Sequence, residues 1–230
     1  MVGTAQTGEA IVNAALNGAG SARAGILAKV RAAVGDHSAA RDTEYAAIPR
    51  EYKREGQSDR AELLSLLSSR LDDYEAGVYH CAPGDIAQTV ATAMKARGKT
   101  SLLRPEHLPQ EWLPAAYNFP PVDGLSYPEI DKGEGVITGC VAAIAFTGTI
   151  ILQHGVRDGR RALTLIPDYH LCIVLADQIV ETVPEGFHRL KGLETLPLTT
   201  VSGPSATADI EMARVKGVHG PRFLDVILVA

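Results

Sequence analysis

The run from position 202 to 211, Ser-Gly-Pro-Ser-Ala-Thr-Ala-Asp-Ile-Glu, concentrates hydroxyl and carboxyl side chains in ten residues. It follows the apolar stretch Leu198–Val201, so we expect a loop at the end of a strand, where open α/β sheets bind ligands. Backbone N–H groups beside a helix start would favour a carboxylate or a phosphate there. The structural alternative is that Ser205 and Thr207 cap a short helix with Asp209 and Glu211 in its first turn.

A second candidate is the tripeptide Thr147-Gly148-Thr149, which lies between two apolar stretches. Two hydroxyl groups and exposed backbone amides could face a substrate as hydrogen-bond donors. The competing interpretation is a hairpin turn in which Gly148 adopts a positive φ angle, and the residue types favour this turn.

The third candidate is His219 in the sequence Gly-Val-His-Gly-Pro, residues 217–221. Two glycines let the backbone bring the imidazole close to another loop, where it could act as a general base or donate to a carboxylate. Asp209 or Glu211 could orient it. A histidine in a Gly-Pro turn is more often only a turn residue, and that alternative stays open.

Two further groups favour structural roles. His170 begins the apolar stretch His-Leu-Cys-Ile-Val-Leu, so we expect it at the rim of a sheet with its ring satisfied by backbone groups. His154, Arg157, Arg160 and Arg161 form a basic segment that predicts a solvated loop, with anion binding as the minor alternative.

Composition excludes several classes of protein. The formal net charge of −5 argues against binding nucleic acid through phosphate neutralisation. The three cysteines, Cys81, Cys140 and Cys172, are scattered, so neither a structural zinc site nor a cysteine-ligated iron–sulfur cluster is expected, and the thiols are typical of a cytoplasmic protein. No metal site or cofactor is therefore expected in this chain. The longest apolar run, 136–152, is interrupted by glycine and threonine, which predicts buried strand and no membrane span.

The chain changes character near residue 80. Residues 1–79 predict a helical N-terminal extension, with one helix ending at Gly35 and another opening at Asp59, where Glu62 completes a capping box. A third helix is expected from Asp85, capped with Gln88, to Gly98.

Residues 80–230 predict an α/β domain with helices on both faces of an open, mixed or parallel sheet. The proline-rich segment 104–135 is expected to be a long ordered connection that Trp112, Tyr117, Phe119 and Tyr127 pin to the body. The expected strands are 136–145, 149–152, 170–175, 198–201 and 223–229, and a helix is expected over 179–190.

Four segments in order resemble the LUD-domain family, and within it the lactate utilization proteins: Gly139–Thr149, Leu165–His170, Ser202–Glu211 and Gly217–Pro221. The resemblance covers residues 135–230 closely and extends more loosely to about residue 80. It implies a fold similar to the sugar-phosphate isomerase and CoA-transferase superfamily. It also implies a part in oxidising L-lactate to pyruvate, as a non-redox component beside partner proteins that carry iron–sulfur clusters.

Carried over by position, the resemblance implies a pocket with His219, Asp209 and Glu211 as catalytic candidates. The ligand-binding candidates are Thr147, Gly148, Thr149, Gly203, Pro204, Ser205 and Thr207. Members of the family commonly have an acidic residue before Thr-Gly-Thr, and here it is Phe146, which can neither accept a proton nor act as a nucleophile.

Two other functions are compatible with the same residues. One is a stand-alone enzyme of the superfamily type that acts on a carboxylate, a phosphate or an acyl compound, because hydroxyl, carboxyl and imidazole groups gather on loops at strand ends. The other is a binding module that senses a small organic acid without turnover.

Overall fold

The computed structural model describes residues 22–35, 38–155, 158–193, 195–207, 215–217 and 219–230. Internal contacts divide the chain into a unit that ends at Tyr52 and a body, Lys53–Ala230. In the first unit, residues 22–34 are helical and α2 (Ser38–Ala47) follows. Gly35 ends the first helix with a φ of 69°, as predicted. None of the described helices is long and apolar enough to cross a membrane.

The body is built on two four-stranded sheets. The first has the order β1-β10-β5-β2, and all its neighbouring strands are parallel. The second is mixed, has the order β6-β3-β4-β7, and pairs β3 with β6 in parallel. The strands of the first sheet are β1 (Gly77–Cys81), β2 (Val136–Thr138), β5 (Tyr169–Leu175) and β10 (Phe223–Val229). Those of the second are β3 (Ala142–Ile144), β4 (Thr149–Gln153), β6 (Ile179–Val180) and β7 (Leu198–Val201).

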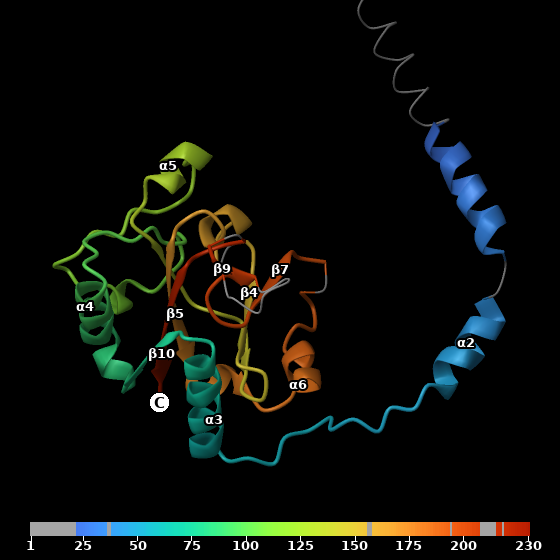
Figure 1. The fold of residues 1–230 in the computed structure, drawn as a ribbon, viewed down its shortest axis with the longest axis horizontal. Coiled ribbons are helices and arrows are strands. Elements are labelled where there is room, and N and C mark those ends of the chain that lie inside the picture. The colour runs from blue at the N-terminus through green and yellow to red at the C-terminus, as the bar shows by residue number, and fades with distance from the viewer. Residues whose placement is uncertain (1–21, 36–37, 156–157, 194, 208–214, 218) are drawn as a thin grey trace, which may run out of the picture. The chain divides into compact units, whose positions relative to one another are not determined.

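Helices cover both faces of the parallel sheet, as the sequence predicts. Leu171 and Ile173 of β5 pack with α4 (Ile86–Ala96), whereas Cys172 and Val174 pack with α3 (Arg60–Asp73) and the second sheet. Figure 1 shows α4 on one side of β5 and β10, and β4, β7 and α6 (Val183–His188) on the other. Because β5 is covered on both faces, it can be continuously apolar.

The helices α3 and α4 begin in different ways. Asp59 caps α3, and Glu62 returns the bond to the Asp59 backbone, so the predicted capping box is present. At the start of α4, Asp85 makes no side-chain cap, because the chain enters through the 3₁₀ turn Pro83–Asp85. The predicted cap at Asp85 is therefore wrong, although α4 ends at Arg97 and Gly98 as expected.

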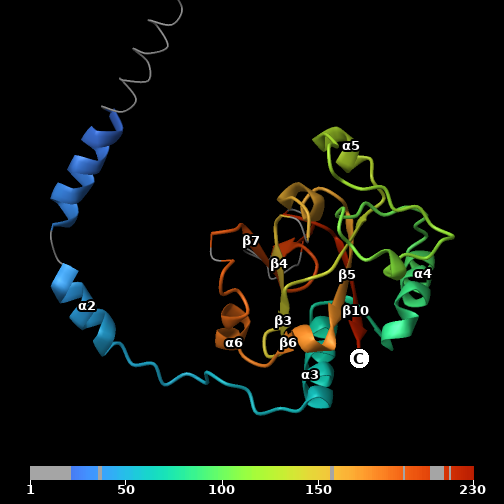
Figure 2. The same ribbon diagram turned by 180° about the vertical axis from the view of Figure 1, so that it is seen from behind.

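The predicted strand 136–145 is two strands in different sheets. The chain leaves the first sheet after β2 because the carbonyl of Gly139 accepts bonds from the side chains of Thr138 (2.9 Å) and Cys172 (3.4 Å). It enters the second sheet at β3. The expected helix 179–190 is also corrected: residues 179–180 form β6, and the helix begins only after Thr182, whose side chain caps it. Figure 2 shows β3 and β6 beside α6 from behind.

The connection 104–135 is ordered, with the 3₁₀ turn Gln110–Trp112 and the short helix α5 (Tyr127–Asp131). Trp112, Tyr117 and Phe119 pack on the core, as predicted. Tyr127 is 65% exposed at the start of α5 and does not pack in the core, but the guanidinium of Arg160 lies over its ring, 5.7 Å from the centroid.

Residues 53–58 are tied to the residues that follow β6 by two carboxylates, of which Glu185 accepts from the backbone N–H of Gly56 at 3.0 Å. Glu181 accepts bonds from the backbone N–H groups of Gln57 (2.7 Å) and Ser58 (2.8 Å) and pairs with Lys53. The Lys53 ammonium, helped by the two amides, lowers the pKa of Glu181 to about 2. Leu67 and Leu71 of α3 lie in the apolar core, and Val78 of β1 packs against it. The domain boundary predicted after residue 79 stays a prediction.

Candidate functional site

A cavity of about 220 Å³ opens between the two sheets, where β5 and β10 begin and β7 ends. The cavity lies at the carboxyl end of β7, where the sequence predicts a ligand-binding loop, but the parallel sheet contributes the amino ends of its strands. The cavity is smaller than the roughly 300–1,000 Å³ of sites for drug-sized ligands. Its lining is Arg161, Thr164, His170, Thr199, Thr200, Val201, Ser202, Gly203, Pro204, Ser205, His219, Gly220, Pro221 and Leu224.

Arg161 supplies positive charge to this cavity. It opens the 3₁₀ turn Arg161–Thr164, and one of its guanidinium nitrogens donates to Thr164 Oγ1 at 3.1 Å. Burial lowers the pKa of Arg161, yet an arginine stays charged at neutral pH. Among the described residues, Arg97 and Arg222 pair with aspartates, whereas no carboxylate pairs with Arg161. A half-buried guanidinium that has no counter-ion in the described part of the chain favours an anionic ligand.

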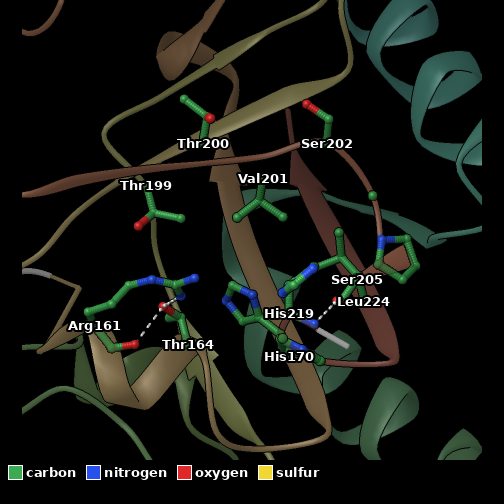
Figure 3. Close-up of a pocket in the computed structure, with 14 residues that line it drawn as sticks. Arg161, Thr164, His170, Thr199, Thr200, Val201, Ser202, Ser205, His219 and Leu224 are labelled. Carbon is green, nitrogen blue, oxygen red and sulfur yellow. Dashed lines mark hydrogen bonds between the residues drawn. The ribbon is translucent and has the colours of Figure 1, made fainter. Parts of the chain in front are cut away.

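His170 lies on β5 next to this charge. Figure 3 shows the guanidinium of Arg161 pointing toward its imidazole, with His219 beside them. The imidazole is buried, and its Nε2 lies 2.8 Å from Thr138 Oγ1. Burial, with a smaller contribution from Arg161, lowers the pKa of His170 to about 4. The ring is therefore neutral at physiological pH, and its bond to a side chain differs from the backbone bond expected from sequence.

A second buried histidine supports the wall of the cavity. His154 Nδ1 lies 3.3 Å from the carbonyl of Gly159, and its Nε2 lies 2.6 Å from Thr199 Oγ1. Because a carbonyl can only accept, Nδ1 carries the proton and Thr199 donates to Nε2. Burial lowers the pKa of His154, and the charge of Arg161 adds to this effect.

The Gly203 loop closes the cavity on the side of β7. Gly203 has a φ of 87°, and a Cβ there would lie 2.5 Å from Tyr74 Cβ, so the close approach to the end of α3 requires glycine. Ser205 then joins two loops: its N–H donates to the carbonyl of Pro221, and its Oγ accepts from the N–H of His219 at 2.9 Å. Of the candidates from sequence, Gly203, Pro204, Ser205 and His219 therefore meet at one cavity.

The Thr147-Gly148-Thr149 tripeptide forms the hairpin turn between β3 and β4 and does not line the cavity. Gly148 has a φ of 62°, as the turn requires. A chain of hydroxyl groups runs from Thr147 through Thr149 to Ser202, with 2.8 Å between successive oxygens. Figure 3 shows the Ser202 side chain pointing away from the two histidines, so the tripeptide contacts the opposite side of this loop.

The remaining candidates lie at or beyond the edge of the described residues. Thr207 belongs to the strand β8 (Ala206–Thr207), which pairs with β9 (Val215–Lys216), so a helix capped by Ser205 is excluded, while a helix capped by Thr207 would lie outside the described residues. Asp209 and Glu211 lie outside the described residues, and their proposed roles beside His219 stay predictions. Phe146 is 62% exposed and lies outside the cavity lining.

The sequence favours structural roles for Arg161 and His170 and does not single out Thr199, whereas the structure places all three on the cavity lining. The signals in the sequence are a basic segment at 154–161 and a histidine that begins an apolar strand. What raises their importance is that a 3₁₀ turn, β5 and β7 bring the three side chains to one cavity.

Comparison with known proteins identifies the family. The LUD domain matches residues 130–229. A Deinococcus radiodurans protein named lactate utilization protein C is 45% identical over 180 residues, which span 74% of this chain and 81% of the relative. A Halalkalibacterium halodurans protein of the same name is 35% identical over 101 residues, or 44% of its length.

Among solved structures, a crystal structure of a DUF162 family protein from Deinococcus radiodurans superposes with a TM-score of 0.66 at 38% identity. It covers 76% of this chain and all of that one. The family match spans β2 to β10 and thus every element that lines the cavity. On these similarities, the chain belongs to the LUD-domain family that includes the Deinococcus radiodurans protein.

Proposed function

We propose that this protein is a cytoplasmic, non-redox component of a system that oxidises L-lactate to pyruvate. In this proposal, partner proteins with iron–sulfur clusters carry the electrons, because the three cysteines are scattered through the chain and two of them are buried. The observation that carries the proposal is the 45% identity to a relative named lactate utilization protein C.

The cavity supports a role with a small organic acid. Arg161 offers a charge without a carboxylate partner in the described part of the chain, and Ser205 adds a hydroxyl group. A volume of about 220 Å³ suits a ligand of a few heavy atoms. Lactate, a small carboxylate with one hydroxyl group, fits these properties. We further propose that the fold is related to the sugar-phosphate isomerase and CoA-transferase superfamily.

Growth on L-lactate tests this proposal. We expect a strain that lacks the gene to stop growing on L-lactate and to grow normally on glucose, and the wild-type gene to restore growth. The tagged protein should co-purify from lactate-grown cells with proteins that show the absorption of iron–sulfur clusters. Normal growth of the deletion strain on L-lactate would overturn the proposal.

A second function is catalysis by this chain alone, and the neutral imidazole of His170 favours it. At neutral pH the ring is unprotonated, so one of its nitrogens can accept a hydrogen bond from a ligand hydroxyl and orient it, while its pKa of about 4 makes it a weak general base. Purified protein that converts a small acid or its acyl derivative without any partner would support this function. A rise in melting temperature with the acid, but no product, would support a sensing module instead.

A further inference from the structure

We infer that the cavity distinguishes a 2-hydroxy acid from the corresponding 2-oxo acid, with Arg161 binding the carboxylate and His170 accepting a hydrogen bond from the hydroxyl group. This inference rests on the proposed function, because it names the class of ligand for the same cavity. The inference predicts that the protein binds lactate more tightly than pyruvate, a preference that membership of the family does not determine.

The first step is the direction of the hydrogen bonds around His170. A threonine hydroxyl has one proton to donate. Thr138 Oγ1 lies 2.9 Å from the carbonyl of Gly139, which can only accept, and we assign the proton to this bond. With that assignment, Thr138 Oγ1 accepts from His170 Nε2, which lies 2.8 Å away. The proton of the neutral ring is therefore on Nε2.

The second step concerns the other ring nitrogen. With Nε2 protonated, Nδ1 of His170 has a lone pair and no proton. No group in the described part of the chain donates to Nδ1, and His170 lines the cavity that holds Arg161. This nitrogen can accept a hydrogen bond from a ligand hydroxyl, and it would face the lone pairs of a ligand carbonyl.

Thr199 adds a second acceptor on the facing wall. Its single proton goes to Nε2 of His154, so the lone pairs of its oxygen remain. Figure 3 shows the Thr199 side chain on the same side of β7 as Arg161 and His170. The cavity thus combines two fixed acceptors with one cation that no carboxylate of the described residues pairs with. A ligand that matches it carries a carboxylate and a hydroxyl donor, which is the pattern of a 2-hydroxy acid.

Calorimetric titration of the full-length protein with L-lactate, pyruvate and propionate tests the inference. Propionate has the carboxylate without any oxygen on carbon 2. We expect L-lactate to bind at least about tenfold more tightly than propionate or pyruvate. With propionate the acceptor nitrogen of His170 is left without a hydrogen bond, and with pyruvate it faces the lone pairs of the ligand carbonyl. Equal affinity for L-lactate and pyruvate, or no binding of any of the three acids, would overturn the inference.

Two pairs of variants assign the roles. Arg161→Gln should weaken all three acids on the order of a hundredfold, whereas Arg160→Gln, at the neighbouring exposed arginine that does not line the cavity, should change nothing. Thr138→Val removes the acceptor that fixes the ring, so lactate should lose its advantage over pyruvate, and Thr138→Ser should restore it. Unchanged selectivity in Thr138→Val would contradict the assignment.

A direct measurement on the unmodified protein avoids any effect of substitution on folding. A proton–nitrogen correlation spectrum of the histidine side chains distinguishes the two neutral forms of His170. We expect the proton on Nε2, and a proton on Nδ1 overturns the inference. The growth experiment is independent of the binding experiment. If the gene is needed for growth on L-lactate but the protein binds lactate and pyruvate equally, the proposed function stands and this inference fails. If the protein prefers lactate but the gene is not needed for growth, only the proposed function fails.

Discussion

The hydroxyl group of Thr138 fixes which nitrogen of the His170 imidazole carries the proton, and so which nitrogen can accept a hydrogen bond. Thr138 holds one nitrogen, the cavity receives the other, and burial near Arg161 keeps the ring neutral. Neutrality has a thermodynamic consequence apart from ligand binding. A histidine that resists protonation in the folded state makes stability depend on pH.

The sign of this dependence follows from the two pKa values. The pKa of His170 falls from 6.5 in the unfolded chain to about 4 in the folded protein. Below pH 6.5 only the unfolded state takes up the proton, so stability is complete above pH 6.5 and falls as the pH drops toward 4. The loss from this residue is at most about 3 kcal/mol.

Replacing His170 with asparagine should therefore flatten the fall in the free energy of unfolding between pH 6.5 and 4. Part of the slope should remain, since burial also lowers the pKa of His154. Urea unfolding at several pH values measures it, with His107→Asn, at an exposed histidine, as the control. Parallel curves for the wild type and His170→Asn would contradict the assignment.

At the scale of elements, one buried carboxylate joins two strands and a helix. Asp225 of β10 is fully buried and accepts two bonds from Arg97 at the end of α4, at 2.5 and 3.0 Å. Tyr169 of β5 donates to the same carboxylate at 3.0 Å. Gly77 of β1 pairs opposite Asp225, and a Cβ there would lie 2.3 Å from the carboxylate. The absence of a side chain at Gly77 makes room for the ion pair.

Asp225→Asn should lower the free energy of unfolding by about 3 kcal/mol, because Arg97 is then left partly buried without its counter-ion. The double variant Arg97→Met/Asp225→Leu should recover much of that loss, since it removes both charges. Asp168→Asn is the matched control: its pair with Arg222 is exposed, and such pairs contribute about 1 kcal/mol or less. Denaturant unfolding compares them, and equal losses for Asp225→Asn and Asp168→Asn would argue against this role.

Local patterns identified many of these elements. The apolar run of β5 predicts a strand covered on both faces, and Asp59 with Glu62 marks the start of α3. Errors arose where a distant residue decides the outcome. Cys172 and Thr138 bind the carbonyl of Gly139, and this bond ends β2 where sequence predicts one continuous strand.

The site shows the same limit. The loops of Gly203 and His219 were identified because their residue types are informative by themselves. Arg161 was not, because the sequence alone does not show whether a carboxylate lies beside an arginine in the folded protein. Only the tertiary structure shows that aspartates pair with Arg97 and Arg222 and that none in the described part of the chain pairs with Arg161.

At the scale of the whole molecule, the apolar packing of the body is self-contained. The four described apolar clusters draw only on residues from Leu63 onward, and Glu181 fastens the segment that begins at Lys53. Several apolar side chains of the first unit, including Ile26, Tyr45 and Ile48, are more than half exposed.

A chain that starts at Lys53 should therefore fold and keep the melting temperature and the acid affinity of the full-length protein. Differential scanning calorimetry and the titration described above measure both. A second truncation that starts after α3 serves as the contrast, because it removes Leu67 and Leu71 from the core, and it should not fold. A large drop in melting temperature for the first truncation would show that the body depends on residues 1–52.

The position of β10 between β1 and β5 has a consequence for biosynthesis. Asp225 pairs with Gly77 on one side and with Leu171 on the other, so one of the two inner strands of the parallel sheet is synthesised after all the other described strands. While the ribosome is still adding residues, β1 and β5 each present an unpaired apolar edge, which is a template for aggregation. Until residues 223–229 emerge, the nascent chain needs protection that chaperones can supply, and stalled or shortened products are expected to be insoluble.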